Sequence, residues 1–249
     1  MTDTILYTDL SGYYDLMCAD IDYQSQSETV DRLQQIFGNG GSKYLDLCCG
    51  TGPHIRHFID RGYDCAGLDI NQPMIDIARQ RCPEAQFNTQ DMCEFSVTEP
   101  LDLITCFLYS IHYSGNTARL KECIQHVYSA LAPNGLFCFN AVDKNKIDNN
   151  SCTSHAAEQS GNRFVFSSQW YYCGSGDQQA LKLNIQKSTA NTTQAWRDEH
   201  RMVAVSFEEL LALLSPYFEV HVFEHDFEKL VPFAGSTGNA LFTCVKITA

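Results

Sequence analysis

The feature that most constrains the fold is the alternation of strand and helix patterns over the first 142 residues. Short apolar runs that lead to Asp46, Asp69 and Asp91 alternate with amphipathic segments, the first of which has Ser25 and Glu28 at capping-box spacing. Strands that alternate with helices in this way are typical of a parallel sheet covered by helices. The sequence therefore predicts a doubly wound α/β core.

After residue 143 the pattern changes to a period of two, which is typical of antiparallel strands. The runs RFVFSSQWYY and LKLNIQK flank GSGD and predict a β-hairpin. A helix is expected from Ser206, which forms a second capping box with Glu209, and two closing strands are expected near 217–225 and 240–247. The predicted fold is a Rossmann-like seven-stranded sheet with helices on both faces and an antiparallel β insertion after strand five.

The composition argues against several classes of protein and site. The chain has 249 residues, 44% of them hydrophobic, which is enough for a core, and its formal net charge of −13 opposes binding to nucleic acid. Its twelve cysteines are scattered through the expected strands without a CxxC pair, which favours reduced buried thiols over disulfides or a metal site. The sequence shows no secretory signal and no apolar run of about 20 residues, so we expect a cytoplasmic protein with no membrane association.

The segment YLDLCCGTGPH at residues 44–54 places a carboxylate and two glycines where the first strand ends. In an open parallel sheet, ligands bind beyond the carboxyl ends of the strands. Gly50 and Gly52 let backbone N–H groups approach such a ligand, and the helix expected to follow points its free N–H groups at the same space. Asp69 is placed to accept hydrogen bonds from both hydroxyls of a ribose, and Asp91 from the amine of adenine. Together these residues predict a site for adenosine.

The glycine spacing and Asp46 decide which adenosine compound is expected. A dinucleotide-binding fingerprint, G-x-G-x-x-G, is not matched here, because Ile55 stands where a third glycine would follow Gly50 and Gly52, and Cys48 stands two residues before Gly50. Asp46 would face the phosphates of a dinucleotide, which is unfavourable, whereas it suits the ammonium group of an amino acid. A compound with adenosine at one end and a cationic amino acid at the other is S-adenosylmethionine, which we expect as the cofactor.

These segments resemble the class I S-adenosylmethionine-dependent methyltransferases. The resemblance covers about residues 44–113 and rests on YLDLCCGTG, GLDINQPMIDIAR, NTQDMCEF and LDLITCFLYSIHY. The stretch from CCGTG to DMCEF is especially similar to the small-molecule branch that includes the amino-sugar N,N-dimethyltransferases, and YYDLMCADIDY is similar to the cap of that branch. The resemblance implies transfer of a methyl group to nitrogen or oxygen of a small-molecule acceptor.

The resemblance also implies which residues hold the cofactor. They would contact the methionine part, the ribose hydroxyls, the two faces and the edge of the adenine, and the carboxylate or sulfonium group. The implied residues are Tyr14, Tyr23, Asp46, Gly50, Thr51, Gly52, Asp69, Ile70, Met74, Asp91, Met92 and Phe107.

Four units are expected along the chain. They are an N-terminal cap and first helix at 1–40, a cofactor-binding core at 41–142, an antiparallel β lid or substrate insertion at 143–205, and a C-terminal completion of the core sheet at 206–249.

Three side chains are candidates for catalysis. His112 and Tyr113 follow the fourth strand, and His200 lies in the segment AWRDEH of the insertion. A general base is needed only when the acceptor arrives with a proton on the reacting atom. Each histidine could instead have a structural role, and Tyr14 and Tyr23 could instead pack in the core.

Two kinds of function remain open from the sequence. The first is an enzyme that methylates a small molecule, and the second is a non-catalytic S-adenosylmethionine-binding or sensor protein on the same fold. A nicotinamide-dependent oxidoreductase would need the glycines that this turn lacks. The identity of the acceptor and the oligomeric state also remain open.

Overall fold

The computed structural model describes residues 5–8 and 10–247, and its centre is a seven-stranded sheet. The strands are β1 (Lys43–Leu47), β2 (Asp64–Asp69), β3 (Gln86–Thr89), β4 (Leu101–Cys106), β5 (Leu131–Val142), β10 (Phe218–Glu224) and β11 (Asn239–Lys246). They lie in the order β10-β11-β5-β4-β1-β2-β3. The strands from β1 to β5 are parallel, and β11 pairs antiparallel with β5 and β10. The predicted α/β fold is confirmed.

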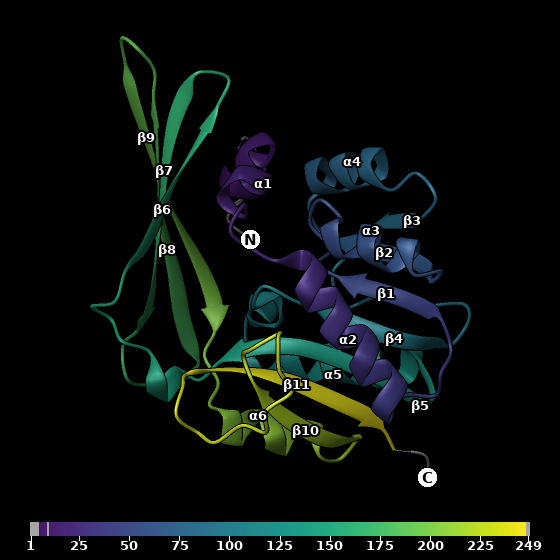
Figure 1. Ribbon diagram of the computed structural model, residues 1–249. Coiled ribbons are helices and arrows are strands. Elements are labelled where there is room, and N and C mark those ends of the chain that lie inside the picture. Colours follow the sequence, from purple (N-terminus) through teal and green to yellow (C-terminus); the bar gives the residue numbers. More distant parts are fainter. Residues whose placement is uncertain (1–4, 9, 248–249) are drawn as a thin grey trace.

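Helices cover both faces of this sheet (Figure 1). They are α2 (Tyr23–Phe37), α3 (Pro53–Asp60), α4 (Gln72–Arg81), α5 (Thr117–Ala130) and α6 (Phe207–Leu214). Alternate residues of β5 belong to two buried clusters: Leu136 packs with residues of α2, α3 and α4, whereas Phe137 packs with residues of α5 and α6. Among the helices of the described residues, none is long and apolar enough to cross a membrane.

Between β5 and α6 the chain forms a second sheet, which stands upright beside the core in Figure 1. Its strands are β6 (Thr153–Gln159), β7 (Asn162–Tyr172), β8 (Gln178–Ser188) and β9 (Thr193–Val203). All neighbouring pairs are antiparallel, and the predicted hairpin around GSGD is the pair β7 and β8. The antiparallel insertion after strand five is therefore confirmed, and we call this sheet the insertion.

The N-terminal segment lies between the insertion and the core (Figure 1). It forms two short 3₁₀ helices, η1 (Ile5–Tyr7) and η2 (Ser11–Tyr13), and one turn of helix, α1 (Tyr14–Met17). Leu6 and Leu10 are buried against Phe164, Phe166 and Leu183 on the inner face of the insertion. Two further 3₁₀ helices, η3 (Ser110–Ser114) and η4 (Lys144–Lys146), follow β4 and β5.

The start of α2 differs from the sequence prediction. The helix begins at Tyr23, and Asp22 is its N-cap, with Oδ1 accepting a hydrogen bond from Ser25 N at 2.9 Å. The hydroxyl of Ser25, which the sequence predicts as the cap, instead donates to the carbonyl oxygen of Phe227 at 3.2 Å. A contact with a distant part of the chain has therefore replaced the local cap. The second predicted capping box, at the start of α6, is confirmed.

The cysteines are free thiols throughout the described chain. Only Cys152 and Cys173 are exposed, whereas Cys48 is half-buried and the others are buried. The expectation of reduced, buried thiols is therefore met at most of these positions, and small apolar side chains of this kind fill a core well.

Candidate active site

The backbone after β1 turns sharply at the carboxyl edge of the sheet. Cys48, Gly50 and Gly52 have φ angles of 56°, 54° and 80°, in the left-handed region that favours glycine. A Cβ on Gly52 would lie 3.3 Å from the Cβ of Ala78 on α4, and a Cβ on Gly50 would lie 3.6 Å from the ring of Tyr14. The two glycines therefore let α4 and Tyr14 approach this corner closely.

Asp69, at the end of β2, holds the same corner. Its carboxylate is buried and accepts hydrogen bonds from Gly50 N at 3.1 Å, Asn71 N at 2.8 Å and Asn71 Nδ2 at 3.1 Å. Burial raises the pKa of Asp69, and these hydrogen bonds oppose the rise because they favour the ionised form. The residue predicted to bind ribose therefore lies beside the glycine turn.

Asp46 is a buried acid whose histidine neighbour is neutral. Its Oδ1 accepts a hydrogen bond from the hydroxyl of Thr105 at 2.7 Å, and its Oδ2 lies 3.9 Å from His54 Nδ1. Burial lowers the pKa of His54 to about 3 and raises the pKa of Asp46 to about 7. A cation beside Asp46 would stabilise its ionised form, so this position suits an ammonium group.

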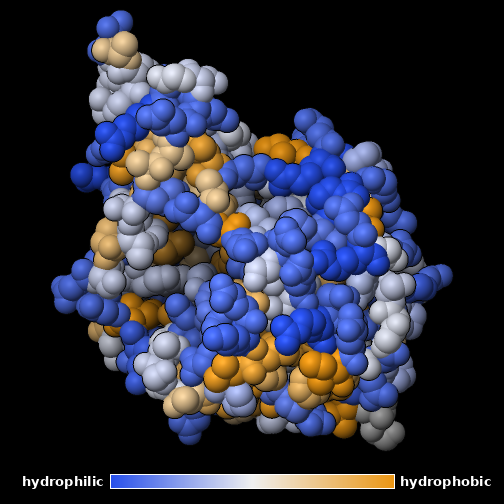
Figure 2. Space-filling view, viewed as in Figure 1, coloured by the Kyte–Doolittle hydropathy of each residue, from blue (hydrophilic) through white to orange (hydrophobic). Residues whose placement is uncertain are grey.

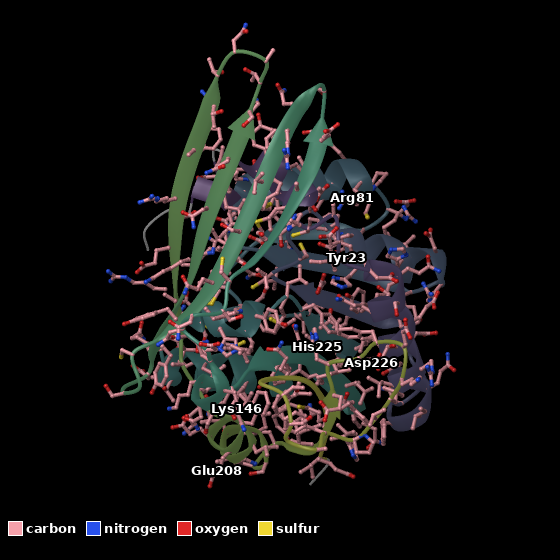
Figure 3. The ribbon with its side chains drawn as sticks, turned by 60° about the vertical axis from the view of Figure 1, so that its left-hand side comes forward. Tyr23, Arg81, Lys146, Glu208, His225 and Asp226 are labelled. Atoms are coloured by element: carbon pink, nitrogen blue, oxygen red, sulfur yellow. The ribbon has the colours of Figure 1, made fainter. Side chains whose placement is uncertain are left out.

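A small cavity opens onto Asp46, and we call it the first cavity. The residues that line it are Tyr14, Tyr23, Asp46, Cys48, Cys49, Pro53, His54, Phe107, Leu108 and Ser110. Within the described residues, the buried hydroxyl of Tyr23 has no hydrogen-bond partner. In the view of Figure 3, Tyr23 lies between Arg81 and His225. A carboxylate and an unpaired hydroxyl in one cavity fit the ammonium and carboxylate groups of S-adenosylmethionine.

A second cavity lies between the insertion and the N-terminal segment and shares Tyr14 and Leu108 with the first. Figure 2 shows the surface hollowed between the upright sheet and the core, with hydrophobic side chains in the hollow. Leu108 and Tyr109 have φ angles of 53° and 62°, and Tyr109 N donates to Asn140 Oδ1 at 3.0 Å. A positive φ angle at a residue other than glycine costs on the order of 1 kcal/mol or more. Residues strained in this way are concentrated at functional sites. The strained turn after β4 thus forms part of the wall between the cavities.

Four side chains form a relay beside the second cavity. The hydroxyls of Tyr7 and Tyr113 lie 2.8 Å apart, and Tyr113 is hydrogen-bonded to Nδ1 of His200. Asp198 Oδ2 lies 3.1 Å from His200 Nε2. Burial lowers the pKa of His200, and the nearby carboxylate of Asp198 opposes this decrease. Burial raises the pKa of Tyr113. At neutral pH the tyrosines therefore keep their protons, and Nδ1 of His200 can accept one.

A protein-family profile described as a methyltransferase domain matches residues 45–135. This part of the chain is therefore similar to a methyltransferase domain. The dTDP-3-amino-3,6-dideoxy-alpha-D-glucopyranose N,N-dimethyltransferase of Streptomyces fradiae is 30% identical over 115 residues, 46% of this chain and 45% of that protein. The dTDP-4-amino-2,3,4,6-tetradeoxy-D-glucose N,N-dimethyltransferase of Saccharopolyspora spinosa is 34% identical over 92 residues, 37% of each. The chain thus spans about half the length of these relatives, or less.

Solved structures resemble this protein over nearly its whole length. The structure of Streptomyces venezuelae DesVI matches with a TM-score of 0.83 at 20% identity. The matched region covers 96% of this chain and 99% of the DesVI chain. CalS10 with S-adenosylmethionine bound, an amino pentose methyltransferase from Micromonospora echinaspora, has a TM-score of 0.78 at 19% identity, covering 92% and 93%. At these identities the likeness shows the fold alone. Together with the sequence relatives, it confirms the predicted resemblance to class I S-adenosylmethionine-dependent methyltransferases.

His112 differs from the other two catalytic candidates because both of its ring nitrogens contact backbone. Its Nδ1 lies 2.9 Å from the carbonyl oxygen of Val203, and its Nε2 accepts a hydrogen bond from Val142 N at 3.0 Å. The side chain is fully buried, and burial lowers its pKa to about 4. His112 thus joins the end of β5 to the end of β9, an arrangement that favours a structural role.

Replacing His112 with alanine should lower the free energy of unfolding by about 3 kcal/mol, because two buried backbone groups lose their partners. Urea denaturation followed by circular dichroism would measure this change. His126→Ala, at a half-buried histidine on α5, is the matched control and should lower the free energy of unfolding by less than about 1 kcal/mol. A His112→Ala variant as stable as the parent but without methyl transfer would instead support the predicted catalytic role.

The residues predicted to flank the adenine do not line either cavity. Ile70 is 43% exposed after the end of β2, whereas Met74 and Met92 are buried. Asp91 Oδ2 forms an ion pair with Arg119 Nη2 at 2.6 Å. The roles of these four residues toward adenine therefore stay predictions.

A clamp that no sequence pattern predicts joins the N-terminal segment to the glycine turn. Asp15 on α1 accepts a hydrogen bond from the hydroxyl of Thr51 at 2.5 Å and pairs with Arg81 on α4. Arg81 also donates to the carbonyl oxygen of Thr51 at 3.0 Å. Thr51, predicted to contact the cofactor, thus holds the cap over the site. Asp15 and Arg81 are 66 residues apart, so no local pattern links them.

Proposed function

We propose that this protein transfers the methyl group of S-adenosylmethionine to nitrogen or oxygen of a small-molecule acceptor, with an amine favoured. The observation that carries the proposal is that the two cavities meet at Tyr14 and Leu108. The first cavity contains the carboxylate of Asp46, and Tyr113 with its partner His200 lies at the second. A donor in one cavity and an acceptor in the other would meet at the shared wall.

The first cavity would bind the amino-acid end of S-adenosylmethionine, whose sulfonium group supplies a methyl group already activated for transfer. Asp46 would accept hydrogen bonds from the ammonium group, and the hydroxyl of Tyr23 would donate to the carboxylate. Asp69 would accept from the ribose hydroxyls beside Gly50, and Tyr14 would cover the sulfonium side. Alignment of the reacting atoms by such contacts can supply roughly 7–11 kcal/mol of the rate enhancement.

Tyr113 would take the proton that the acceptor must lose. A protonated amine has no lone pair with which to attack, so its proton must leave first. The oxygen of Tyr113 would accept this proton while its own proton moves to Nδ1 of His200. Asp198, 3.1 Å from Nε2, would stabilise the imidazolium that results. The same relay would serve a hydroxyl acceptor.

We further propose that each of the four expected units has a separate role. The core at 41–142 would hold the cofactor, the insertion at 143–205 would act as lid and substrate-binding element, the segment at 1–40 would cap the site, and 206–249 would complete the sheet. The acidic net charge of −13 supports a small-molecule acceptor over nucleic acid. A cytoplasmic location stays a prediction.

Methyl transfer distinguishes this function from the alternative, a protein that binds S-adenosylmethionine without turnover. We would incubate the protein with methyl-labelled S-adenosylmethionine and a panel of amines, phenols and alcohols. We expect label in an amine and one molecule of S-adenosylhomocysteine for each methyl group transferred. Tight binding of the cofactor with no transfer to any member of the panel would favour the alternative.

Cofactor affinity should depend on pH through Asp46, whose pKa is about 7. Only the ionised carboxylate attracts the ammonium group, so affinity should rise roughly tenfold from about pH 6 to about pH 7.5. It should fall again above about pH 8, where the amino group of the ligand loses its proton. Calorimetric titration with S-adenosylhomocysteine would measure both limbs. Asp46→Asn should bind weakly and lose the rising limb, whereas Asp64→Asn, at the far end of β2, should retain it.

A further inference from the structure

We propose that the acceptor is an amine on a neutral, apolar ring system that carries one hydroxyl or carbonyl group, and not a nucleotide-linked sugar. The inference rests on the proposed function, because it concerns the cavity in which the acceptor would lie. The matched relatives are named for dTDP-linked amino sugars, so the proposal separates this chain from them.

The walls of the second cavity are largely apolar and aromatic, and they also contain the neutral polar side chains of Thr153, Ser167, Ser168 and Asn184. Phe166, Trp170 and Leu183 line it from the insertion, and Met17 and Ile21 line it from the N-terminal side. An apolar ring system would be drawn into such a space by the hydrophobic effect.

The charges around the second cavity oppose a phosphate group. None of the described residues that line it is a lysine or an arginine. Lys187, on the same strand as Leu183, donates to the hydroxyl of Tyr13 at 3.0 Å and lies 5.7 Å from the centre of the Phe164 ring. A diphosphate would therefore enter an apolar cavity near the carboxylate of Asp198 without a cation to pair with it. Burial of an unpaired charge is costly, and a neutral acceptor avoids that cost.

One polar atom in the wall has no hydrogen-bond partner in the part of the chain that the structure describes. His155 lines the cavity from β6, and its ring stacks on Phe166 at a centroid distance of 5.3 Å. Its Nδ1 lies 4.0 Å from Asp20 Oδ2, but its Nε2 is buried with no hydrogen-bond partner among the described residues. A hydroxyl or carbonyl group on the ring system would satisfy Nε2. A buried polar atom that gains a partner in this way contributes to specificity.

Trp170 allows binding in this cavity to be measured directly. The chain has two tryptophans, Trp170 in the cavity wall and Trp196 on β9, so Trp196→Phe leaves Trp170 as the sole tryptophan emitter. We would load this variant with S-adenosylhomocysteine and titrate it with tyramine, with phenethylamine and with dTDP. The same titrations on Trp170→Phe, which retains Trp196, provide the control for changes outside the cavity.

We expect a saturable change in Trp170 emission with tyramine and phenethylamine and none with dTDP. His155→Phe should weaken the binding of tyramine, which has a hydroxyl group, about fivefold. The affinity for phenethylamine, which lacks the hydroxyl group, should stay within about twofold of the parent value. His126→Phe should change neither affinity. An equal effect of His155→Phe on both amines would overturn the assignment of the hydroxyl or carbonyl group.

Saturable binding of dTDP that displaces tyramine would overturn the proposed acceptor class, and so would the absence of a response to both amines. Calorimetric titration with S-adenosylhomocysteine on the same preparation keeps this result separate from the proposed function. Failure to bind that ligand counts against methyl transfer itself. Normal binding of that ligand together with dTDP binding counts only against the neutral acceptor.

Discussion

Tyr113→Phe should lower kcat by roughly 10²- to 10³-fold, because the acceptor loses the oxygen that takes its proton. The ring remains, so the walls of the second cavity keep their shape, and the affinity for S-adenosylhomocysteine should stay within about twofold. Single-turnover measurements with saturating cofactor would separate this loss from effects on product release. Loss of the transition-state contact predicts an equal fall in kcat/KM.

Tyr217→Phe is the matched control for this experiment. The hydroxyl of Tyr217 accepts a hydrogen bond from Gln125 Nε2 at 2.9 Å on the surface, away from both cavities. This variant should keep the parent kcat. His200→Asn should reproduce much of the Tyr113→Phe loss, since it removes the final acceptor of the proton. Parent-like turnover in both relay variants would show that the acceptor is deprotonated in solution before it binds.

Asp69→Ala should weaken binding of S-adenosylmethionine about 100-fold. Two hydrogen bonds from ribose hydroxyls to a buried carboxylate contribute about 1.5 kcal/mol each, and about 1.4 kcal/mol corresponds to a factor of ten. The substitution also removes the acceptor of Gly50 N, so the glycine turn should become less ordered. Calorimetric titration with S-adenosylhomocysteine would measure the loss.

Asp64→Ala separates the local effect from a general effect of charge. Asp64 begins β2, at the opposite end of the strand from Asp69, and its side chain is exposed. Its removal should leave cofactor affinity within about twofold. Asp69→Asn keeps the shape of the side chain and loses its charge. Its affinity for S-adenosylhomocysteine should lie between those of the parent and of Asp69→Ala. An Asp69→Ala variant that binds as tightly as the parent would refute the ribose role.

The candidate active site is assembled from segments that cannot form it separately. The core supplies Asp46 and Asp69 at strand ends, the N-terminal segment supplies Tyr14, the start of α2 supplies Tyr23, and the insertion supplies His200. The clamp between α1 and α4 and the packing of Leu6 on the insertion hold these parts together. Each of the two proposed half-sites therefore depends on the N-terminal segment.

The amino-acid sequence was sufficient for the architecture and for the residues at the strand ends. Hydrophobic periodicity is a local property, and the direction of a parallel strand places its last residue at the ligand-binding edge. For that reason the positions of Asp46, Asp69 and the glycine turn could be predicted without any knowledge of contacts. The missed start of α2 shows the limit of this reasoning, because Ser25 bonds to Phe227 from a distant part of the chain.

Which side chains meet was decided only by the tertiary structure. Tyr113 and His200 are 87 residues apart, and both were predicted as candidates, but only folding of the insertion onto the core joins them and excludes His112 from their relay. Tyr7 had no signal in the sequence at all. The physical reason is that a hydrogen bond requires two atoms within about 3 Å, and the sequence specifies such proximity only within one helix or strand. Burial, which sets the pKa values of Asp46 and His200, likewise exists only once the two sheets and the N-terminal segment have packed.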